Sequence, residues 1–254
     1  GVYDFMKKKR TGGRIVRTLI LIICIAVFCF SAYELIKIFL EYNAGSQEYD
    51  RLEQFTSQTA VESGPSEFSV NYPGLRKIND EIVGWIRVPD TTINYPIMQT
   101  GDNNYYLTHT FEHNTNIAGS IFLDFRNAAD FSDRNTIIYG HHIKNGKMFA
   151  DLRHYTDEFY REHPVIYLNT PEEGNVEYEI FSFYLTGNYR DTYGETYTYQ
   201  FSDDESYRDY LNMIVSQSQY DTGVDVSTDD SIITLSTCTN RTDDERYIVH
   251  ARKI

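Results

Sequence analysis

The hydrophobic positions of this chain fall into two regions with very different patterns. Near the N-terminus, Thr18–Tyr33 runs for 16 residues without a charged side chain, and apolar residues resume after Glu34. From Leu75 onward, apolar residues come instead in short runs that turn-forming residues separate. The segment between them, Glu41–Ser69, is polar. The pattern predicts an N-terminal apolar helix, a polar and partly helical stalk, and a region built of β-strands.

The region from Leu75 to the C-terminus is predicted to be a closed, mostly antiparallel sheet, which places the chain in the mostly β class. Its apolar runs are rich in Val, Ile, Tyr and Thr and follow one another closely, as the strands of small barrels do. Strands are expected near Ile82–Val88, Ile93–Met98, Ser120–Leu123, Thr136–Tyr139, Val165–Asn169, Val176–Thr186, Ser231–Cys238 and Tyr247–Lys253.

Two helical patterns interrupt the predicted strands. Met148–Tyr155 is a short candidate, and Asp203–Ser218 is a better one because its apolar residues recur at helical spacing. Ser202 and Glu205 form a capping-box pattern, in which each side chain bonds the other residue's backbone N–H at the start of a helix. We expect the second helix to pack on the barrel, where it could also form a wall of a site near Cys238.

The N-terminal apolar run is expected to be an uncleaved signal-anchor. Its length lies between the roughly 7–15 residues of a signal-peptide core and the roughly 20 of a spanning helix. Arg17 and Lys37 can extend the effective span by snorkelling toward the head groups. A cleaved signal peptide and a buried core helix are the alternatives. The sequence lacks a good cleavage signal, and the basic flank fits a core helix badly.

Charge predicts the orientation of this anchor. Residues 1–17 carry six basic side chains and one acidic side chain, an excess that keeps the N-terminus in the cytoplasm. Everything after about residue 40 is then expected outside the cell, facing the cell wall. Met6 directly precedes the basic run Lys7–Arg10, so we expect Met6 to be the natural start and Gly1–Phe5 not to be native.

These patterns divide the chain into four expected parts. They are a basic cytoplasmic tail over 1–17, a transmembrane signal-anchor over 18–40, an extracellular stalk or N-terminal helical region over 41–74, and a catalytic domain over 75–254. The formal net charge is −14, and the chain beyond the basic tail is more acidic still. Because phosphate binding needs a basic face, nucleic acid is excluded as a partner.

Cys238 is the candidate nucleophile. Cys24 and Cys29 lie in the apolar run, so the exported part carries one thiol. Exported proteins use cysteines in pairs, and an unpaired exported thiol calls for a reason. Catalysis, an inert buried thiol and intermolecular pairing all stay open at this point. The apolar pattern Ile232–Cys238 predicts a strand that ends at the thiol, and a strand holds its last residue rigidly, as a nucleophile requires.

A thiol needs a nearby imidazole or cation to become a thiolate. His141 and His142 follow a predicted strand and Gly140, whose backbone freedom can place either ring. Arg246 precedes the last predicted strand and is therefore anchored, whereas Arg241 lies in a polar turn. An anchored guanidinium can present fixed donors to a developing oxyanion, although a surface ion pair is the alternative for Arg246.

With these residues assembled, the chain resembles the sortases, and class B sortases in particular. Thr234-Leu235-Ser236-Thr237-Cys238 has the family's T-L-x-T-C form, with Arg246 eight residues further on. Tyr139-Gly140-His141-His142 is similar to the family's Gly-His segment, in which His141 matches the catalytic histidine. The predicted helix before the cysteine strand fits the extra helix of class B. The segments outside the site that resemble class B are Val83–Ile86, Ile93–Ile97 and Ala118–Asp124.

The resemblance, which runs from about residue 75 to 254, implies an eight-stranded β-barrel and a cysteine transpeptidase. Cys238 would attack the carbonyl of a Thr in the C-terminal sorting signal of a secreted protein. Arg246 would stabilise the oxyanion, and His141 would protonate the leaving amine. A peptidoglycan or lipid II stem-peptide amine would then take the acyl group. Ser236 and Thr237 are the substrate-binding candidates. No cluster has metal-ligand spacing, so no metal or other cofactor is expected.

Other functions remain open beside this one. An exported cysteine protease would hydrolyse its substrate whether or not an amine is added. An L,D-transpeptidase would need a Ser-x-Gly-Cys-type motif, which the residues around Cys238 do not supply. A non-catalytic binding module would not depend on Cys238. A pilin-polymerising sortase often carries a lid before its barrel, and Glu41–Ser69 lacks a convincing lid pattern.

Overall fold

The computed structural model describes the chain over residues 2–59, 67–186, 195–238 and 245–254. The chain divides into two compact units, residues 1–44 and 45–254. Helix α1 (Val2–Leu52) makes up the first unit and enters the second. Among the described residues, its stretch from Arg14 onward is the one helix long and apolar enough to cross a membrane. The predicted apolar helix is confirmed, and its large apolar side chains are exposed, unlike those of a core helix.

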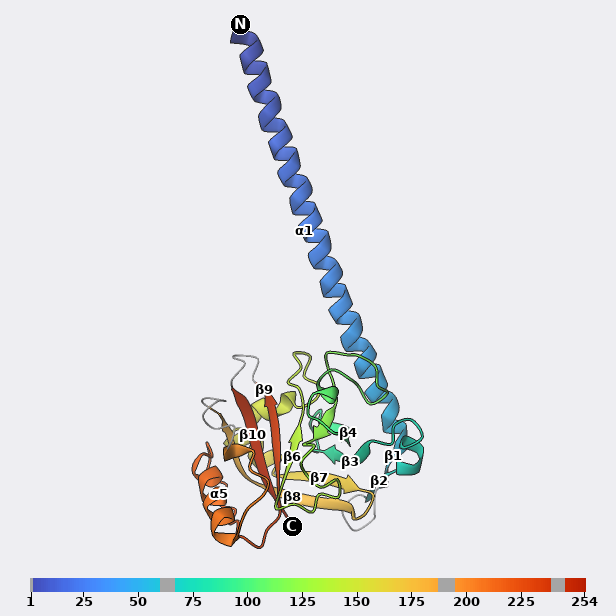
Figure 1. The fold of residues 1–254 in the computed structure, drawn as a ribbon, viewed down its shortest axis with the longest axis vertical. Helices are drawn as coiled ribbons and strands as arrows, with labels where there is room; N and C mark the ends of the chain where they lie inside the picture. The colour runs from blue at the N-terminus through green and yellow to red at the C-terminus, as the bar shows by residue number, and fades with distance from the viewer. Residues whose placement is uncertain (1, 60–66, 187–194, 239–244) are drawn as a thin grey trace. The chain divides into compact units, whose positions relative to one another are not determined.

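The second unit is built on a closed barrel of eight strands (Figure 1). Around the barrel the strands follow the order β10-β8-β7-β3-β4-β5-β6-β9. The pairs β4–β5 and β6–β9 are parallel, and the other neighbours are antiparallel. The strands are β3 (Ile82–Arg87), β4 (Asn94–Met98), β5 (Ile121–Leu123), β6 (Asn135–Tyr139), β7 (Val165–Thr170), β8 (Gly174–Leu185), β9 (Ile232–Cys238) and β10 (Arg246–Lys253).

The eight predicted strands are all confirmed, to within two residues at either end. Strands β6 and β9 are buried on both faces, which is why their sequences are continuous apolar and hydroxyl-bearing runs and do not alternate. Helix α5 (Asp204–Ser216) covers this part of the barrel. Its Tyr207, Leu211 and Ile214 pack with Ile137 of β6 and Ile232 of β9. The helix thus supports the two strands that lead to the site.

Helix α5 begins one residue later than its sequence pattern suggested. Asp203 is the N-cap: its carboxylate accepts from the Ser206 backbone N–H at 2.8 Å, and the Ser206 hydroxyl accepts from the Asp203 N–H at 3.3 Å. The predicted capping box of Ser202 and Glu205 is therefore wrong. A carboxylate is a strong acceptor at the positively polarised end of a helix, so the cap forms around Asp203.

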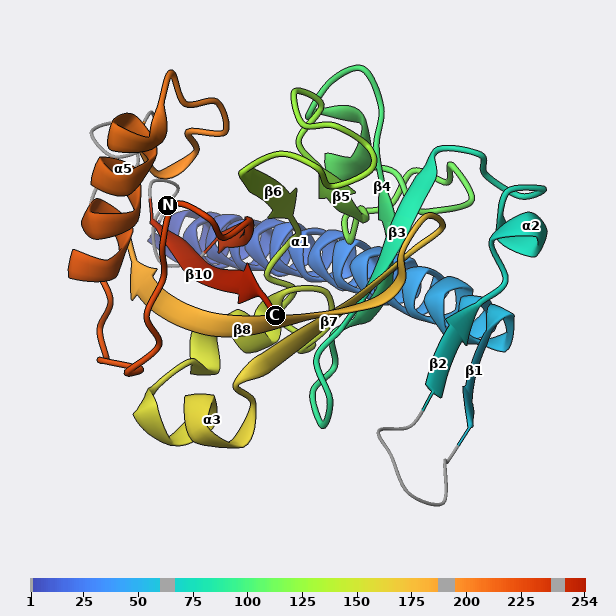
Figure 2. The ribbon, with the colours of Figure 1, turned by 90° about the horizontal axis from the view of Figure 1, so that it is seen from below.

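The remaining elements are short. The predicted helix at Met148–Tyr155 is a 3₁₀ helix, η3 (Ala150–His154). The elements absent from the sequence prediction span too few residues to show a helical or strand period. They are η1 (Glu53–Phe55), β1 (Thr56–Thr59), β2 (Glu67–Val70), α2 (Tyr72–Leu75), η2 (Tyr105–Leu107) and α3 (Asp157–Glu162). Figure 2 shows α5 and the β1–β2 hairpin on opposite sides of the barrel.

The last turns of α1 pack on a loop that reaches the site. The Tyr49 hydroxyl donates to the Gly119 carbonyl at 2.7 Å. Glu48 is only 3% exposed, and its carboxylate accepts from the Thr110 hydroxyl at 2.8 Å. Part of the segment predicted as a stalk therefore belongs to the same unit as the barrel, and it holds the loop over residues 103–120 in place.

Candidate active site

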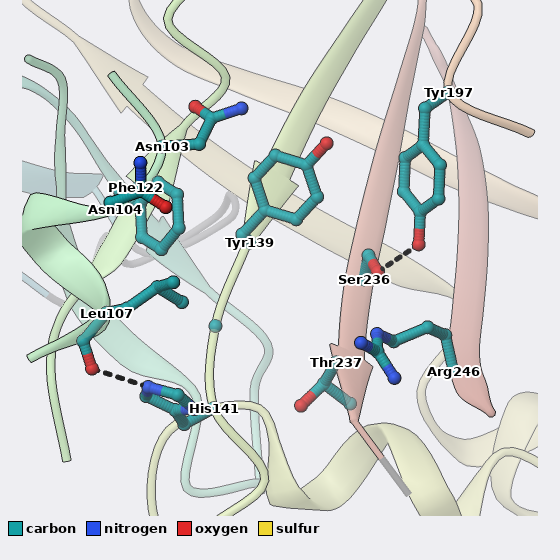
Figure 3. A pocket seen from close by; sticks show the side chains of 11 residues that line it. Asn103, Asn104, Leu107, Phe122, Tyr139, His141, Tyr197, Ser236, Thr237 and Arg246 are labelled. Carbon is teal, nitrogen blue, oxygen red and sulfur yellow. Dashed lines mark hydrogen bonds between the residues drawn. The ribbon is translucent and has the colours of Figure 1, made fainter. Parts of the chain in front are cut away.

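A pocket of about 240 Å³ opens at the ends of β6 and β9 (Figure 3). Four residues singled out in the sequence, His141, Ser236, Thr237 and Arg246, line it together although they come from three separate segments. The full lining is Asn103, Asn104, Leu107, Phe122, Tyr139, Gly140, His141, Tyr197, Ser236, Thr237 and Arg246.

Cys238 is the last residue of β9 and directly follows the pocket residue Thr237. Its side chain lies outside the described part of the structure, as does Arg241. The backbone of Cys238 is described, and its partner across the antiparallel β9–β10 pair is Arg246. The strand register therefore puts the candidate nucleophile and the candidate oxyanion donor side by side.

Arg246 is the first residue of β10, so the strand anchors it at its base. Its backbone N–H donates to the Thr186 hydroxyl at 2.8 Å, and its Nη1 donates to the Glu245 carbonyl at 2.9 Å. Figure 3 shows the guanidinium reaching from β10 toward β9, beside Thr237. These contacts give the guanidinium a fixed direction, which is what an oxyanion donor requires.

His141 follows β6 and faces the same pocket. Its Nε2 lies 2.6 Å from the Leu107 carbonyl oxygen. A carbonyl oxygen only accepts, so Nε2 carries the proton, and Nδ1 is the nitrogen that can gain or release one. Of the two adjacent histidines, His142 is buried and does not line the pocket, and its Nε2 lies 3.2 Å from Arg153 Nη1. The structure thus brings His141, and not His142, to the pocket.

Gly140 permits this arrangement for a reason that differs from the sequence expectation. Its φ is not in the left-handed region, so backbone freedom is not what the position needs. A Cβ at Gly140 would instead collide with Ile121 Cδ1 and come within 2.7 Å of Phe149 Cδ2. The Gly140 N–H donates to the Ser236 carbonyl at 3.1 Å, which continues the β6–β9 pairing to the edge of the pocket. The position is therefore glycine because there is no room for a side chain.

Replacing Gly140 with Ala is expected to lower both stability and activity. The added methyl overpacks the contact with Ile121 and Phe149, at a cost of about 1–3 kcal/mol, and it displaces the adjoining His141. Thermal unfolding and peptide cleavage by the full chain in detergent would measure the two effects. Gly101→Ala is the matched control, because a Cβ there meets nothing within 4 Å. An unchanged melting temperature for Gly140→Ala would show that the site is not tightly packed.

The two hydroxyl residues before Cys238 have different surroundings. Ser236 is buried, and its Oγ lies 2.6 Å from the Tyr197 hydroxyl, a pocket residue from a different segment. The Thr237 side chain is 2% exposed, and its Oγ1 has no hydrogen-bond partner among the described residues. Because a buried hydroxyl without a partner is costly, Thr237 Oγ1 is suited to bond a ligand that enters the pocket.

His250 lies outside the pocket and makes structural contacts within the barrel. It is fully buried between β8 and β9, with Nδ1 2.9 Å from the Thr234 hydroxyl and Nε2 3.1 Å from the Tyr184 hydroxyl. Burial lowers the pKa of His250 to about 3, so the ring stays neutral at physiological pH. Among the described residues, no group of His, Cys, Asp and Glu side chains is placed to hold a metal ion.

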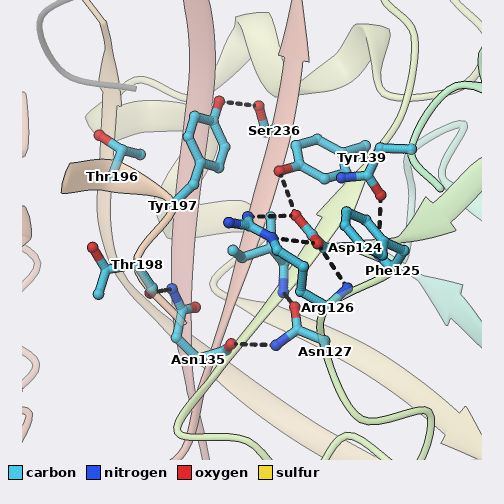
Figure 4. A network of polar contacts seen from close by, with 12 residues as sticks. Asp124, Phe125, Arg126, Asn127, Asn135, Tyr139, Thr196, Tyr197, Thr198 and Ser236 are labelled. Atoms are coloured by element: carbon cyan, nitrogen blue, oxygen red, sulfur yellow. Dashed lines mark hydrogen bonds and ion pairs between the residues drawn. The ribbon is translucent and has the colours of Figure 1, made fainter. Parts of the chain in front are cut away.

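Sequence reasoning assigned no role to several pocket residues. Leu107 lies 34 residues before His141, to which its carbonyl is bonded, and Tyr197 lies 39 residues before its partner Ser236. No local pattern marks either residue. Tyr139 had a signal, because it opens the segment similar to the family's Gly-His motif. Its hydroxyl donates to Asp124 at 3.0 Å in a polar network beside the pocket (Figure 4).

Comparisons with known proteins agree on one family. A sequence model described as Sortase domain matches residues 86–254. The chain is 40% identical over 230 residues to sortase B of Listeria monocytogenes, covering 89% of this chain and 90% of that protein. It is similar to the Staphylococcus aureus sortase B–substrate complex (TM-score 0.67, 35% identity, 72% of this chain and 84% of that chain). It is also similar to a sortase B complexed with triglycine (TM-score 0.67, 35% identity, 72% and 85%).

Proposed function

The chain belongs to the sortase family of cysteine transpeptidases, and from this premise we propose that it attaches secreted proteins to the cell wall. It cuts a C-terminal sorting signal after Thr and joins the Thr carbonyl to an amine of the wall peptide. The observation that carries this proposal is the β9–β10 register, which sets Arg246 opposite Cys238 at the edge of the pocket that His141 also lines.

In the first half-reaction, the Cys238 thiolate attacks the Thr carbonyl carbon and forms a C–S bond. The carbonyl π electrons move to oxygen, and the Arg246 guanidinium stabilises the resulting oxyanion. The C–N bond to the next residue then breaks, and protonated His141 donates from Nδ1 to the leaving amine. The products are a thioacyl enzyme and the released C-terminal peptide.

In the second half-reaction, neutral His141 accepts a proton from the incoming amine. The amine nitrogen attacks the thioester carbonyl, and Arg246 again faces the oxyanion. Collapse of this intermediate breaks the C–S bond, restores the Cys238 thiolate and leaves a new amide. The apolar walls that Leu107, Phe122 and Tyr139 provide limit access of water to the thioester.

Ser236 and Thr237 act on the substrate side of this reaction. Thr237 Oγ1 is buried in the pocket wall without a described partner, so it donates to, or accepts from, the bound peptide next to the nucleophile. Ser236 is already paired with the Tyr197 hydroxyl and contributes through that pair. A substrate complex is known for the similar Staphylococcus aureus sortase B, which supports substrate binding by this chain as well.

The membrane and wall partners follow from α1 and from the family. The exposed apolar stretch of α1 crosses the membrane once, with the basic residues 1–17 in the cytoplasm and the barrel outside. The acceptor is an amine of a peptidoglycan or lipid II stem peptide. The complex of a similar sortase B with triglycine supports an amine of this kind as the nucleophile.

If the enzyme is a transpeptidase, an added amine should take the acyl group and change the product from a free acid to an amide. The full chain in detergent would be incubated with a library of Thr-containing sorting peptides, with and without triglycine, and the products identified by mass spectrometry. Peptides cut after Thr should appear as triglycine conjugates when the amine is present. Products that stay free acids at every triglycine concentration would favour an exported cysteine protease, and the absence of any cleavage after Thr would refute the proposal.

A further inference from the structure

Tyr139 and Tyr197 line the pocket together, and we call this pair of rings the tyrosine wall. A buried carboxylate lies next to it, bonded to Tyr139. Asp124 follows β5 and is completely buried. Its Oδ1 accepts from the Arg126 backbone N–H at 3.0 Å and from Arg126 Nε at 2.9 Å. Its Oδ2 accepts from Arg126 Nη2 at 2.8 Å and from the Tyr139 hydroxyl at 3.0 Å. Figure 4 shows this arrangement, and we refer to the two charged residues as the Asp124–Arg126 clasp.

The clasp holds Tyr139 in one orientation. Burial raises the pKa of Asp124, but the hydrogen bonds and positive charge of Arg126 outweigh it and keep that pKa below its ordinary value. The carboxylate is therefore ionised and can only accept hydrogen bonds. Tyr139 must then donate its proton to Asp124, which fixes the direction of its hydroxyl and of the ring that lines the pocket.

Arg126 also contacts the chain segment that carries Tyr197. Its guanidinium lies 4.7 Å from the centroid of the Tyr199 ring, a cation–π contact. Tyr199 stands two residues after Tyr197, which lines the pocket and is paired with Ser236. The ring centroids of Tyr139 and Tyr197 are 5.7 Å apart. One ion pair thus contacts Tyr139 directly and the segment of Tyr197 through its neighbour.

The turn that carries the clasp is registered on β6. The Asp124 N–H donates to the Ile137 carbonyl, and the Ile137 N–H donates to the Asn127 side chain, both at 2.9 Å. Asn127 Nδ2 also donates to the Asn135 carbonyl at 2.9 Å. The clasp therefore cannot shift along the strand that ends at Tyr139. A displacement of either charged residue would be transmitted to the pocket wall.

We propose that the Asp124–Arg126 clasp is a positioning element that sets the spacing of Tyr139 and Tyr197, and with it the fit of the sorting peptide. The inference rests on the function proposed above and adds residues that touch neither the thiol nor the reacting carbonyl. A buried ion pair is weak evidence of stability, because the cost of removing its charges from water offsets their attraction. The position of this pair is what points to the pocket: it bonds the pocket residue Tyr139 and stacks on Tyr199, two residues after the pocket residue Tyr197.

The test compares Asp124→Asn, Tyr139→Phe and the double variant as full chains in detergent. Each single change removes one side of the same charge-assisted hydrogen bond. Each should raise KM for the sorting peptide about tenfold, the scale of one such bond, with kcat within about twofold of wild type. The double variant should be no worse than the more affected single variant, because both changes remove one contact. Alkylation of Cys238 by iodoacetamide should keep its wild-type rate.

Arg126→Lys extends the test if Asp124→Asn does not fold. Lysine keeps the positive charge, but it lacks the planar guanidinium that bonds both oxygens of Asp124 and stacks on the Tyr199 ring. KM should therefore rise in this variant as well. Glu179→Gln is the matched control: Glu179 accepts from Arg252 at 2.8 and 3.1 Å in an ion pair that lies outside the pocket lining, and KM should not change.

Any one of four outcomes overturns the inference. Wild-type KM in Tyr139→Phe and Arg126→Lys, or losses that multiply in the double variant, would refute the clasp and leave the proposed function intact. A fall in kcat and melting temperature at constant KM would assign the clasp a purely structural role. A wild-type chain that cleaves no sorting peptide would remove the proposed function and the clasp together.

Discussion

Replacing Cys238 with Ala should abolish cleavage of sorting peptides, with kcat reduced by at least about 10⁴-fold. The proposed reaction passes through a thioacyl bond to this residue, and without sulfur no covalent intermediate can form. Pocket binding and the Arg246 guanidinium remain, so only the weak catalysis of direct attack by water or amine is left. The fold should persist, because the change falls on the last residue of β9.

The measurement is a single-turnover assay with mass spectrometry of the enzyme. Wild type should gain the mass of the acyl fragment when the acceptor amine is omitted, and Cys238→Ala should not. The double variant Cys24→Ala, Cys29→Ala is the control, because both thiols lie on the apolar part of α1 and should leave the rate unchanged. Cleavage at the wild-type rate by Cys238→Ala would refute a thiol mechanism, and a binding module would become the better account.

Replacing Arg246 with Ala should slow acylation by roughly 10²–10³-fold, the usual scale for the loss of an oxyanion donor. Strand β10 anchors this side chain opposite Cys238, so its guanidinium is in place before the substrate arrives. Arg246→Lys keeps the charge but loses the rigid fork of donors, and it should recover only part of the rate.

The rate to measure is the burst of C-terminal peptide released in the first turnover, which reports acylation alone. Arg252→Ala is the control on the same strand, since Arg252 pairs with Glu179 and does not line the pocket. A near-normal burst rate in Arg246→Ala would shift the oxyanion role to Arg241, which lies outside the described residues.

Much of the fold could be predicted because the strands carry their own signal. Short runs of Val, Ile, Tyr and Thr between turn residues predicted all eight barrel strands, and helical spacing predicted α5. One error arose because two neighbouring residues suit the same position at the start of a helix. Ser202 and Asp203 both suit an N-cap, and only the packed helix shows that the carboxylate of Asp203 takes that place. The segment at Met148–Tyr155 is too short for periodicity to separate a 3₁₀ helix from an α-helix.

The candidate site was predictable only where its residues stand beside strand ends. Cys238, Arg246 and His141 each lie at the end of a recognisable strand or within two residues of it, and a motif marks each of them. Leu107 and Tyr197 carry no such mark. Leu107 ends a three-residue 3₁₀ helix and Tyr197 lies outside the barrel strands, and both segments are too short or too irregular to show a periodic pattern.

The sequence by itself determined the strands, the apolar N-terminal helix and the position of Cys238 at the end of a strand. These features depend on side-chain periodicity and on residue types near one another in the chain. The tertiary structure alone decided that Leu107 and Tyr197 bond to residues of the pocket, that Gly140 is needed for space, and that the Asp124–Arg126 clasp is bonded to Tyr139. Barrel closure sets β6 beside β9 in parallel, and no local pattern specifies which distant strands become neighbours when a sheet closes.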